Sequence, residues 1–553
     1  MKSLETVLQE WEAVIGLEVH TELTTLNSKM FCSCKVEYGA PPNTHVCPVC
    51  LGMPGTLPVP NRAAIESIVL AGLATGCAIE KHSMFYRKHY FYPDMAKNFQ
   101  TTQGPVAFCM RGGLDLEVLG ASAGERAHLE GTTPLAPEEG YRTRIGITRI
   151  HLEEDAGKLV HVGGESGRIA GADYSLVDYN RCGTPLMELV TEPDLRTPEE
   201  ARLFLQKLRT IYLTLAISNC SMEQGSLRCD GNVSLRPRGS EKLGTKTELK
   251  NMNSFKNLHD GLAFEICRQA GILEEGGRVI QETRHWEPAS RRTISMRSKE
   301  TVDDYRLFPD PDLTPYHLSD EFIARVGARL PELPDARVGR YVAECALSPA
   351  DARALADDID LARFFDAALA TVPGETVPAD EIRTEAVPTD EAHAQAEIKG
   401  VAPDSPAMGS TTAAELAKPL ANLLLNEVNA YLNAEQVALA QTRLEPQHLA
   451  ELARLIADGT ISSKQGREVL ALVFAKGISP GELVEELGIK QVSDTGQIET
   501  VAHTVLSNNA DKVAEYRAGK TGLLGFFVGE AIKATGGTAN PKLLNQTFQR
   551  LLN

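Results

Sequence analysis

The sequence is organised around the segment Thr148-Arg-Ile-His-Leu-Glu-Glu-Asp-Ala-Gly-Lys158, in which three consecutive acids follow an alternation of apolar and polar residues. The alternation predicts a strand, and the Gly-Lys pair predicts a turn after it. Adjacent carboxylates repel one another, so these acids must be solvated, paired or bound to a cation. A solvated turn is the usual reason for one such run. Further polar strands in the first half of the chain favour pairing or a bound cation.

Length and composition are those of a globular protein with several domains. The chain has 553 residues, 42% of them hydrophobic and 24% charged, which is too long for a single core. It contains no apolar run of the roughly 18 residues that a membrane span needs. Its first residues lack the apolar core of a signal peptide, and an odd number of cysteines, eleven, favours a reducing compartment. We expect a cytoplasmic protein that does not contact membranes.

The net charge bears on nucleic-acid partners. At −18, it argues against a protein that coats DNA or RNA non-specifically, because neutralisation of phosphates supplies that kind of affinity. A local basic face on an acidic protein remains compatible with this composition. We expect no DNA partner.

The first polar strand is predicted between Trp11 and Leu23. Its alternation puts Glu18, His20 and Glu22 on one face and apolar residues on the other. Residues two apart on a strand project in the same direction about 7 Å apart, which suits two ligands of one cation. An edge strand with a solvated face would show the same pattern, so this segment alone leaves both possibilities open.

Four cysteines form two close pairs, Cys32 with Cys34 and Cys47 with Cys50. Two such pairs joined by a short loop are typical of a tetrahedral zinc site. Four thiolates enclose the ion and leave no open position, so the predicted site is structural. The alternative is four buried, reduced cysteines.

An aromatic segment follows, from Phe85 to Asp94, with Arg87, Lys88 and His89 among its rings. Cations beside aromatic rings can hold a phosphate or a nucleotide base. An aromatic-rich strand that leads into a Pro-Asp turn would look the same, and the sequence does not distinguish the two.

Polar residues also line later strands. Glu188 interrupts the apolar run from Leu186 to Val190, where a carboxylate is costly unless it is paired or bound to an ion. Alternation in the segments 226–236 and 246–250 predicts two strands that are apolar on one side. The other side carries Arg228, Asp230, Asn232, Ser234, Arg236, Lys246, Glu248 and Lys250. Such a sheet would form the floor of a polar cleft suited to phosphate and cation chemistry.

The remaining pattern divides the chain into three predicted domains. Residues 1–312 form the strand-rich domain that holds the polar cleft. Residues 313–475 form a helical domain, interrupted by an acidic linker or insertion at 371–410 that is rich in Pro, Ala and Glu. Residues 476–553 form a small helical tail. Two segments within the first domain are rich in glycine. Segment 111–140 looks like a hairpin or an insertion, and segment 163–171 looks like a flexible stretch.

These residues together resemble the B subunit of the bacterial and organellar aspartyl/glutamyl-tRNA amidotransferases. The segments that carry the resemblance run in order along the chain: Ile15-Gly-Leu-Glu-Val-His20, Lys88 with Tyr90-Phe-Tyr-Pro-Asp94, Ile145-Gly-Ile-Thr-Arg149 with His151 to Lys158, Gly183-Thr-Pro-Leu-Met-Glu188, Gly225-Ser-Leu-Arg-Cys-Asp230, Glu248-Leu-Lys-Asn251, Gln281-Glu-Thr-Arg284 and Asp304-Tyr-Arg306. The C-terminal tail matches as well.

The resemblance implies an α+β fold: a glutamine-synthetase-like antiparallel sheet, called the cradle, followed by a helical domain and a tail that helps to hold tRNA. It implies that the chain uses ATP to phosphorylate the side-chain carboxylate of Glu or Asp mischarged on tRNA(Gln) or tRNA(Asn). Ammonia from the glutaminase, or A, subunit then displaces the phosphate, and the small C subunit clasps the other two. A non-discriminating aminoacyl-tRNA synthetase is a further expected partner.

The resemblance also assigns residues. It implies that Mg²⁺ is held by Glu18, His20, Glu154 and Glu188, and of the neighbouring acids Glu153 and Glu154 we expect Glu154 to be the ligand. Asp230 and Glu248 are expected beside them as catalytic residues. The residues expected to contact ATP are Lys88, Tyr90, Arg228, Asp230 and Lys250. Transfer of a phosphoryl group needs Mg²⁺ and cations around the γ-phosphate, which agrees with this set.

Two other functions fit parts of the sequence. The first is a metal-dependent ATP ligase that amidates a free small acid, which would have no need of the C-terminal tail. The second is a non-catalytic RNA-binding scaffold stabilised by zinc, in which the carboxylates would be dispensable.

Overall fold

The computed structural model describes residues 2–129, 133–134, 140–163, 171–298, 305–372, 412–489, 495–535, 539 and 541–552. Residues 373–410 of the predicted linker and most of the segment 163–171 lie outside these residues. The chain divides into two compact units, Met1–Leu333 and Pro334–Asn553.

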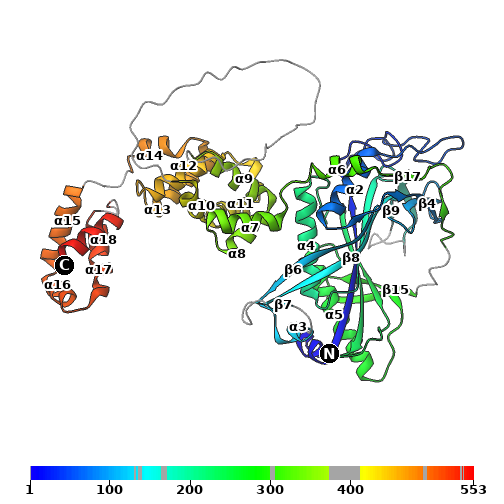
Figure 1. The fold of residues 1–553 in the computed structure, drawn as a ribbon, viewed down its shortest axis with the longest axis horizontal. Coiled ribbons are helices and arrows are strands. Elements are labelled where there is room, and N and C mark those ends of the chain that lie inside the picture. The colour runs from blue at the N-terminus through cyan, green and yellow to red at the C-terminus, as the bar shows by residue number, and fades with distance from the viewer. Residues whose placement is uncertain are drawn as a thin grey trace, which may run out of the picture. The chain divides into compact units, whose positions relative to one another are not determined.

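The first unit is built on a large sheet (Figure 1). In the described part of the chain its thirteen strands include the path β15-β14-β13-β12-β1-β11-β8-β5-β4-β16. The strands of this unit are β1 Trp11–Glu22, β2 Ala78–Ile79, β3 His82–Ser83, β4 Phe85–His89, β5 Phe99–Gln103, β6 Cys109–Leu119, β7 Thr133–Pro134, β8 Gly140–Glu154, β9 Lys158–Val162, β10 Tyr174–Asp178, β11 Pro185–Thr191, β12 Leu227–Pro237, β13 Thr247–Lys250, β14 Glu282–Glu287, β15 Arg292–Ser298, β16 Phe308–Pro309 and β17 Tyr316–His317.

Strand pairing is antiparallel along this path except between β13 and β14, which are parallel. Helix α5, Phe255–Glu274, connects these two strands. A crossover helix returns the chain in its original direction, so the second strand must pair in parallel. The expected antiparallel sheet is therefore correct apart from this one pair.

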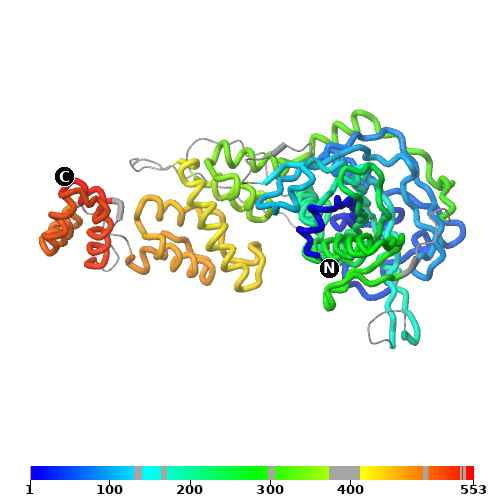
Figure 2. The backbone as a smooth tube through the Cα atoms, turned by 90° about the horizontal axis from the view of Figure 1, so that it is seen from below, coloured from blue at the N-terminus to red at the C-terminus, as the bar shows by residue number. Residues whose placement is uncertain are grey.

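The segment 111–140 contributes an arm of the sheet. Strand β6 pairs with β8 from Cys109 opposite Ile150 to Leu119 opposite Gly140, so the two strands form a long antiparallel ladder. Residues 111–119 of this segment therefore belong to a strand whose antiparallel partner begins at Gly140. Strands β9 and β10 form a separate two-stranded sheet that projects from the unit (Figure 2).

Helices cover one face of the large sheet. The helices of the first unit are α1 Leu4–Glu10, α2 Arg62–Ala74, α3 Ala123–Arg126, α4 Pro198–Thr214, α5 Phe255–Glu274 and α6 Asp320–Gly327. Apolar residues of β1, such as Leu17 and Val19, share one core with Leu205 of α4 and Leu262 of α5. The N-terminal helix α1 lies beside α5 (Figure 2). The opposite face of the strands near β1 carries the polar residues.

Helix α4 begins where the sequence indicates. Thr197 accepts a hydrogen bond from the backbone N–H of Glu200, and Pro198 occupies the first helical position. Such a residue satisfies a backbone donor that the helix itself leaves unpaired. The buried side chains of this helix pack under the central strands and hold them in position.

The second unit is helical. Its elements are α7 Pro334–Cys345, α8 Pro349–Ala356, α9 Ile359–Ala370, α10 Ala413–Asn422, a π-helix Leu423–Val428, α11 Asn429–Glu435, a 3₁₀ turn Leu439–Gln441, α12 Pro446–Ala457, α13 Ser463–Lys476, α14 Pro480–Leu487, α15 Thr495–Asn508, α16 Ala510–Arg517, a 3₁₀ turn Thr521–Leu523, α17 Leu524–Ala534 and α18 Pro541–Leu552. One core extends from Tyr341 to Val484, and a second from Ile498 to Leu552.

The cores differ from the predicted domain boundaries at two points. Leu313, Leu318 and Val326 belong to the core of the first unit, although the sequence suggested a boundary after residue 312. Leu483 and Val484 of α14 belong to the core of the preceding helices, although the tail was expected from residue 476. A capping residue marks where a helix begins in the sequence. The domain to which that helix belongs depends instead on which hydrophobic core buries the apolar face of the helix.

The α+β fold class agrees with the structure: a large sheet with helices on one side, followed by helical regions. Among the described residues, no helix is both long enough and apolar enough to cross a membrane.

Candidate active site

Strand register assembles a row of polar residues across four strands. His151 of β8 lies opposite Glu188 of β11, Glu188 lies opposite His20 of β1, and His20 lies opposite Arg228 of β12. In the next row, Glu18 lies opposite Asp230. Side chains that neighbour one another across paired strands point to the same face. The predicted polar floor therefore forms, and it extends to strand β8.

The carboxylates and imidazoles of this face converge. The Nε2 atom of His20 lies 3.4 Å from Glu188 Oε2, 3.6 Å from Glu18 Oε1 and 3.8 Å from Glu153 Oε1. The Nε2 atom of His151 lies 3.6 Å from the same Glu188 oxygen and 3.8 Å from Glu153 Oε2. We call Glu18, His20, His151, Glu153 and Glu188 the carboxylate–histidine cluster.

The cluster fits a hard divalent cation. Six oxygen or nitrogen ligands at about 2.1 Å from Mg²⁺ lie about 3 Å apart when adjacent and about 4 Å apart when opposite. The ligand atoms of Glu18, His20 and Glu188 all lie within 4.8 Å of one another, as do those of His151, Glu153 and Glu188. The 3.4–3.8 Å separations lie between these two values and exceed the length of direct hydrogen bonds, so they leave room for an ion among the five side chains.

The electrostatics of the cluster also favour a cation. Burial alone would lower the pKa of His20, but Glu188, Glu153 and Glu18 together raise this pKa to about 9. Burial alone would raise the pKa of Glu188, but His151, His20 and Lys88 bring it to about 2. Burial and the nearby charge of Glu188 raise the pKa of Glu18. The cluster thus concentrates negative charge that attracts a positive group.

The expectation that Glu154 joins this cluster is not met, because its neighbour Glu153 does so. Successive residues of a strand point to opposite faces, so only one of these two acids can face His20. Glu154 turns away and accepts hydrogen bonds from the Lys97 ammonium group and from the backbone N–H of Thr101. It lines a pocket of about 220 Å³ together with Lys29, Arg87, Phe99 and Asp310.

The third acid of the run, Asp155, forms a second charged network. Its Oδ2 lies 2.7 Å from Arg228 Nη2 and 3.3 Å from Arg181 Nε. Burial and the adjacent Asp155 charge raise the pKa of Glu22 to about 8. Burial alone would raise the pKa of Asp155, but Arg228 and Arg181 lower it. The ionised Asp155 therefore fixes Arg228 at the edge of the polar face.

Asp230, Glu248 and Lys250 form a third group on neighbouring strands. The Lys250 ammonium group contacts Asp230 and lies 3.2 Å from Glu248 Oε1. Glu248 Oε2 also accepts a hydrogen bond of 2.9 Å from the Thr283 hydroxyl. Burial alone would lower the pKa of Lys250, but Asp230 and Glu248 raise it. These three residues, all expected from the sequence, lie together on the polar face.

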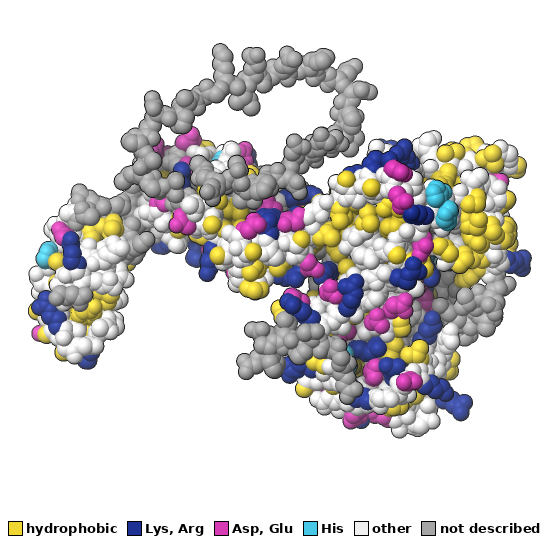
Figure 3. Space-filling view, in the orientation of Figure 1, with side chains coloured by type: hydrophobic (Ala, Val, Ile, Leu, Met, Phe, Trp, Pro, Cys, Tyr) yellow, Lys and Arg dark blue, Asp and Glu magenta, His cyan; other side chains and the backbone are white. Residues whose placement is uncertain are grey.

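Lys88 and Tyr90 lie at the far end of the sheet. Lys88 of β4 contributes to the low pKa of Glu188, and its Nζ lies 4.9 Å from the centre of the Tyr305 ring. Tyr90 follows β4, its ring lies 5.8 Å from that of Tyr92, and it is 40% exposed. Phe91 between them is 67% exposed. Hydrophobic side chains gather on the visible surface of this part of the first unit (Figure 3).

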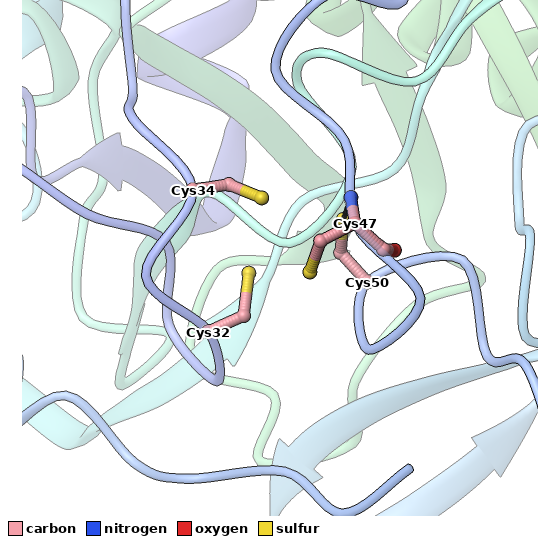
Figure 4. A group of neighbouring side chains, drawn as sticks. All are labelled: Cys32, Cys34, Cys47 and Cys50. Carbon is pink, nitrogen blue, oxygen red and sulfur yellow. Dashed lines mark hydrogen bonds between the residues drawn. The ribbon is translucent and has the colours of Figure 1, made fainter. Parts of the chain in front are cut away.

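The four cysteines meet as their spacing predicted. The sulfur atoms of Cys32, Cys34, Cys47 and Cys50 lie within 4.8 Å of one another and point toward a common centre (Figure 4). Sulfurs around tetrahedral zinc lie about 3.8 Å apart, given a Zn–S distance of about 2.3 Å. A hydrogen bond with Cys32 lowers the pKa of Cys50 to about 4. These residues fit a zinc ion, and we call them the four-cysteine cluster.

The role of His151 was not predicted. Alternation counted from Ile150 and Leu152 places His151 and Glu153 on one face and Glu154 on the other. Alternation counted from Ile145 and Ile147 gives the opposite assignment, because the pairing of β8 with β11 shifts register between Ile147 and Arg149. The three adjacent acids look like one charged unit, which obscures the alternation between them. Arg181, which contacts Asp155, lies in a turn and leaves no periodic signal.

Comparisons with known proteins cover almost the whole chain. A family model described as the GatB/GatE catalytic domain matches residues 13–324, and one described as the GatB domain matches residues 409–552. Three relatives are each named as the B subunit of aspartyl/glutamyl-tRNA(Asn/Gln) amidotransferase. The protein from Persephonella marina is 44% identical over 98% of this chain and 100% of its own length. The protein from Brevibacillus brevis is 44% identical over 99% of this chain and 100% of its own length. The protein from Gloeothece citriformis is 42% identical over 100% of this chain and 100% of its own length.

The match to the catalytic-domain model begins at residue 13, within the strand β1 that carries Glu18 and His20, and includes every residue of the carboxylate–histidine cluster and the four-cysteine cluster. Identity at this level across both chains is evidence of common descent and a common fold. The chain therefore belongs to the GatB family, that of the aspartyl/glutamyl-tRNA(Asn/Gln) amidotransferase B subunits.

Proposed function

We propose that this protein is the kinase and amidation subunit of a tRNA-dependent amidotransferase, a carbon–nitrogen ligase. It acts on Glu-tRNA(Gln), Asp-tRNA(Asn) or both, and converts the mischarged residue to its amide. The observation that carries the proposal is the carboxylate–histidine cluster on the polar face of the sheet, in a chain whose full-length relatives are named for this activity.

The chemistry requires two steps. A carboxylate is a poor acceptor for ammonia, so its oxygen first takes the γ-phosphoryl group of ATP and ADP leaves. Ammonia then attacks the carbonyl carbon of the acyl phosphate, and inorganic phosphate departs as the amide forms. The first step develops charge on the transferred group, so catalysis depends on positioned cations.

The residues of the polar face have distinct roles in this proposal. Glu18, His20, Glu153 and Glu188 hold Mg²⁺, and Glu153 replaces Glu154 in the expected set because it faces His20. Magnesium bound there would screen the phosphate charges of ATP. Arg228, Lys250 and Lys88 contact the phosphates, while Asp230 and Glu248 orient Lys250. Tyr90 stacks against the adenine base.

The four-cysteine cluster holds a structural zinc ion. With four sulfur ligands it offers no open position for a substrate, so it stabilises the loop from residue 32 to residue 50 and takes no part in the chemistry. Lys29 supports this role, because its buried Nζ lies 3.6 Å from Cys50 Sγ and favours the thiolate form.

The assembly partners follow from the chemistry. Because the reaction consumes ammonia, the glutaminase, or A, subunit must supply it, and the small C subunit joins the two. The helical tail, here the core from Ile498 to Leu552, contacts the tRNA body. A non-discriminating aminoacyl-tRNA synthetase supplies the mischarged tRNA. The cytoplasm is the compartment in which these components meet.

The test uses the chain co-expressed with the A and C subunits. Mischarged Glu-tRNA(Gln) and Asp-tRNA(Asn) are supplied separately with glutamine, Mg²⁺ and ATP, and amidation, ATP hydrolysis and glutamine hydrolysis are followed. We expect ATP-dependent amidation by the wild type. We expect Glu153→Gln to lose amidation and retain glutaminase activity, because only the carboxylate of this chain is changed.

A matched control is Glu117→Gln. Glu117 pairs with Arg142 on the β6–β8 ladder, where it is exposed and away from the cluster, so this variant should amidate as the wild type does. Full amidation by Glu153→Gln would overturn the assignment of the cluster. Amidation of a free acid, but of neither tRNA, would favour the small-acid ligase.

A further inference from the structure

The polar face of the sheet continues past the carboxylate–histidine cluster to strand β4. Lys88 of β4 lies opposite Gln100 of β5, and Thr102 of β5 lies opposite Glu153 of β8. Residues two apart on a strand share a face, so Lys88 points to the same side of the sheet as Glu153. The N–H of Tyr90 continues this pairing, because it donates a 3.1 Å hydrogen bond to the carbonyl of the residue before β5. Tyr90 therefore shares the face of Lys88.

Two more tyrosine rings lie beside these residues. The ring of Tyr92 lies 5.8 Å from that of Tyr90, at an angle of 31°. The centre of the Tyr305 ring lies 4.9 Å from Lys88 Nζ, and the Tyr305 carbonyl accepts a 2.9 Å hydrogen bond from the N–H of His89. We call Tyr90, Tyr92 and Tyr305 the tyrosine platform.

The tyrosine platform is separate from the other aromatic residues near β4. The ring of Phe91 lies 6.2 Å from that of His89, and His89 stacks on Phe308 at 5.0 Å. His89 has the strand phase of Arg87, which lines the pocket that contains Glu154. These rings therefore belong to the opposite face of the strand, and the platform remains on the side of the carboxylate–histidine cluster.

The size and composition of the platform suit unpaired nucleotides. Its three tyrosines are 40–41% exposed, and none is a member of the core that the described part of the first unit forms. A whole aromatic side chain covers 150–250 Å², so the platform offers about 300 Å² at most. A stable protein interface takes about 800 Å² from each partner. Exposed aromatic rings beside a lysine are instead typical of sites for single-stranded nucleic acid, because every base can stack on a ring.

The position of the platform selects one nucleotide of the substrate. In the proposed reaction the amino acid is esterified to the terminal ribose of the tRNA, and its side-chain carboxylate must reach the carboxylate–histidine cluster. An extended glutamyl group spans about 7 Å from its ester to that carboxylate, roughly two residues of extended chain. The terminal adenosine must therefore bind beside the cluster. Lys88, which lies over the Tyr305 ring, is close enough to Glu188 to help lower its pKa.

We propose that Tyr92 and Tyr305 form a stacking subsite for the terminal adenosine of the tRNA substrate. The inference rests on the proposed function, and it adds the place where the unpaired 3′ end of the tRNA binds. Tyr90 keeps its role at the adenine of ATP, so the two adenines stack on neighbouring rings. The γ-phosphoryl group and the carboxylate that receives it then approach each other on one face of the sheet.

The test measures binding of uncharged tRNA to the complex of this chain with the A and C subunits, in the absence of ATP. One tRNA is complete, and the other lacks only its terminal adenosine. We expect the wild type to bind the shortened tRNA about fivefold or more weakly, the usual contribution of one stacked base. Tyr92→Ala and Tyr305→Ala should bind the complete tRNA more weakly by a similar factor and should discriminate less between the two tRNAs. Tyr92→Phe keeps the ring and should behave as the wild type does.

A matched control and a kinetic readout accompany the binding measurements. Tyr174 lies on β10 of the separate two-stranded sheet and is 57% exposed, so Tyr174→Ala should discriminate between the two tRNAs as the wild type does. In steady-state kinetics, Tyr92→Ala should raise the KM for the aminoacyl-tRNA and leave the KM for ATP unchanged. Tyr90→Ala should raise the KM for ATP instead.

The outcomes that would overturn the inference are distinct from failure of the proposed function. Equal affinity of the wild type for the two tRNAs, or undiminished discrimination by Tyr92→Ala and Tyr305→Ala, would overturn the subsite and leave the proposed function in place. Loss of the A subunit from these variants during purification would show that the platform is a subunit interface and would also overturn it. Failure of the wild-type complex to bind either tRNA would contradict the proposed function and the inference with it.

Discussion

The two candidate metal sites are built in opposite ways. The four-cysteine cluster comes from one loop between residues 32 and 50 and uses a single residue type. The carboxylate–histidine cluster draws Glu18, His151 and Glu188 from three strands that strand pairing brings together. The first needs only local spacing, whereas the second depends on register across the sheet. A one-residue slip of any of these strands would turn the ligands of that strand to the apolar face.

The difference predicts that the two clusters fail differently when they are disrupted. The carboxylate–histidine cluster should contribute little to stability, because the repulsion between its buried carboxylates is offset by its histidines. The four-cysteine cluster should stabilise its loop when an ion is bound. We therefore expect one cluster to govern activity and the other to govern folding.

The largest expected effect follows from Glu188→Gln. Glu188 belongs to both ligand groups, so its loss should reduce ATP-dependent amidation at least about 100-fold, equivalent to about 2.7 kcal/mol of transition-state stabilisation. The melting temperature should fall slightly, because His151 and His20 stabilise the ionised carboxylate more than burial disfavours it, as the low pKa of Glu188 indicates. Amidation kinetics and thermal denaturation of one preparation measure both. A large fall in melting temperature would instead indicate that this cluster stabilises the fold, as the four-cysteine cluster is expected to do.

The reverse pattern is expected for Cys47→Ser. One thiolate fewer weakens zinc binding, so the zinc content should fall from about one per chain and the melting temperature should fall by about 5 °C or more. The amidation rate of the folded fraction should stay within about twofold of the wild type. Elemental analysis and differential scanning calorimetry measure these quantities. Unchanged stability with no zinc in the wild type would mean that the cysteines are simply buried thiols.

The adjacent acids Glu153 and Glu154 can be compared by the Mg²⁺ dependence of their variants. Glu153→Gln should raise the Mg²⁺ concentration for half-maximal activity about 10-fold or more, because it removes a ligand. Glu154→Gln should leave that Mg²⁺ concentration unchanged, because Glu154 contacts Lys97 on the other side of the strand. Titration of the amidation rate with Mg²⁺ distinguishes them. A shift in Glu154→Gln alone would restore the expectation drawn from the family resemblance.

The smallest effect is expected for Lys250→Gln. This side chain is 40% exposed, so solvent screens its charge, and its removal should raise the KM for ATP by about threefold with little change in kcat. Asp230 and Glu248 lose their common partner in this variant. Steady-state kinetics at saturating tRNA give both constants. An effect confined to kcat would indicate that Lys250 contacts the transition state rather than bound ATP.

The sequence predicted local features more closely than the assembled ones. The clustering of the four cysteines follows from their spacing and the polar faces of β1 and β12 from alternation, and the structure contains both. Family resemblance supplied the sheet and the identities of Glu18, His20 and Glu188. The structure places Glu153, not Glu154, beside His20, and alternation starting at Ile145 does not predict this because the register of β8 shifts between Ile147 and Arg149.

Other features were out of reach of pattern analysis. The partnership of Asp155 with Arg181 depends on how a turn packs against the strand end. The parallel pairing of β13 and β14 depends on the crossover by α5, and membership of α14 in the larger helical core depends on packing. Each is a tertiary choice among arrangements that local propensity allows equally.

The separation of ligands along the chain has a consequence for biosynthesis. The cysteines leave the ribosome together, and a short loop closes with little loss of entropy, so zinc can bind while most of the protein is still unmade. Glu188 emerges much later than His20, by about ten seconds or more at ordinary translation rates. Until β1, β11 and β8 have paired, the carboxylates and imidazoles that would concentrate magnesium stay apart. A chain that binds ions at both clusters would therefore acquire the structural ion early in synthesis and bind at the catalytic cluster only when the sheet is complete.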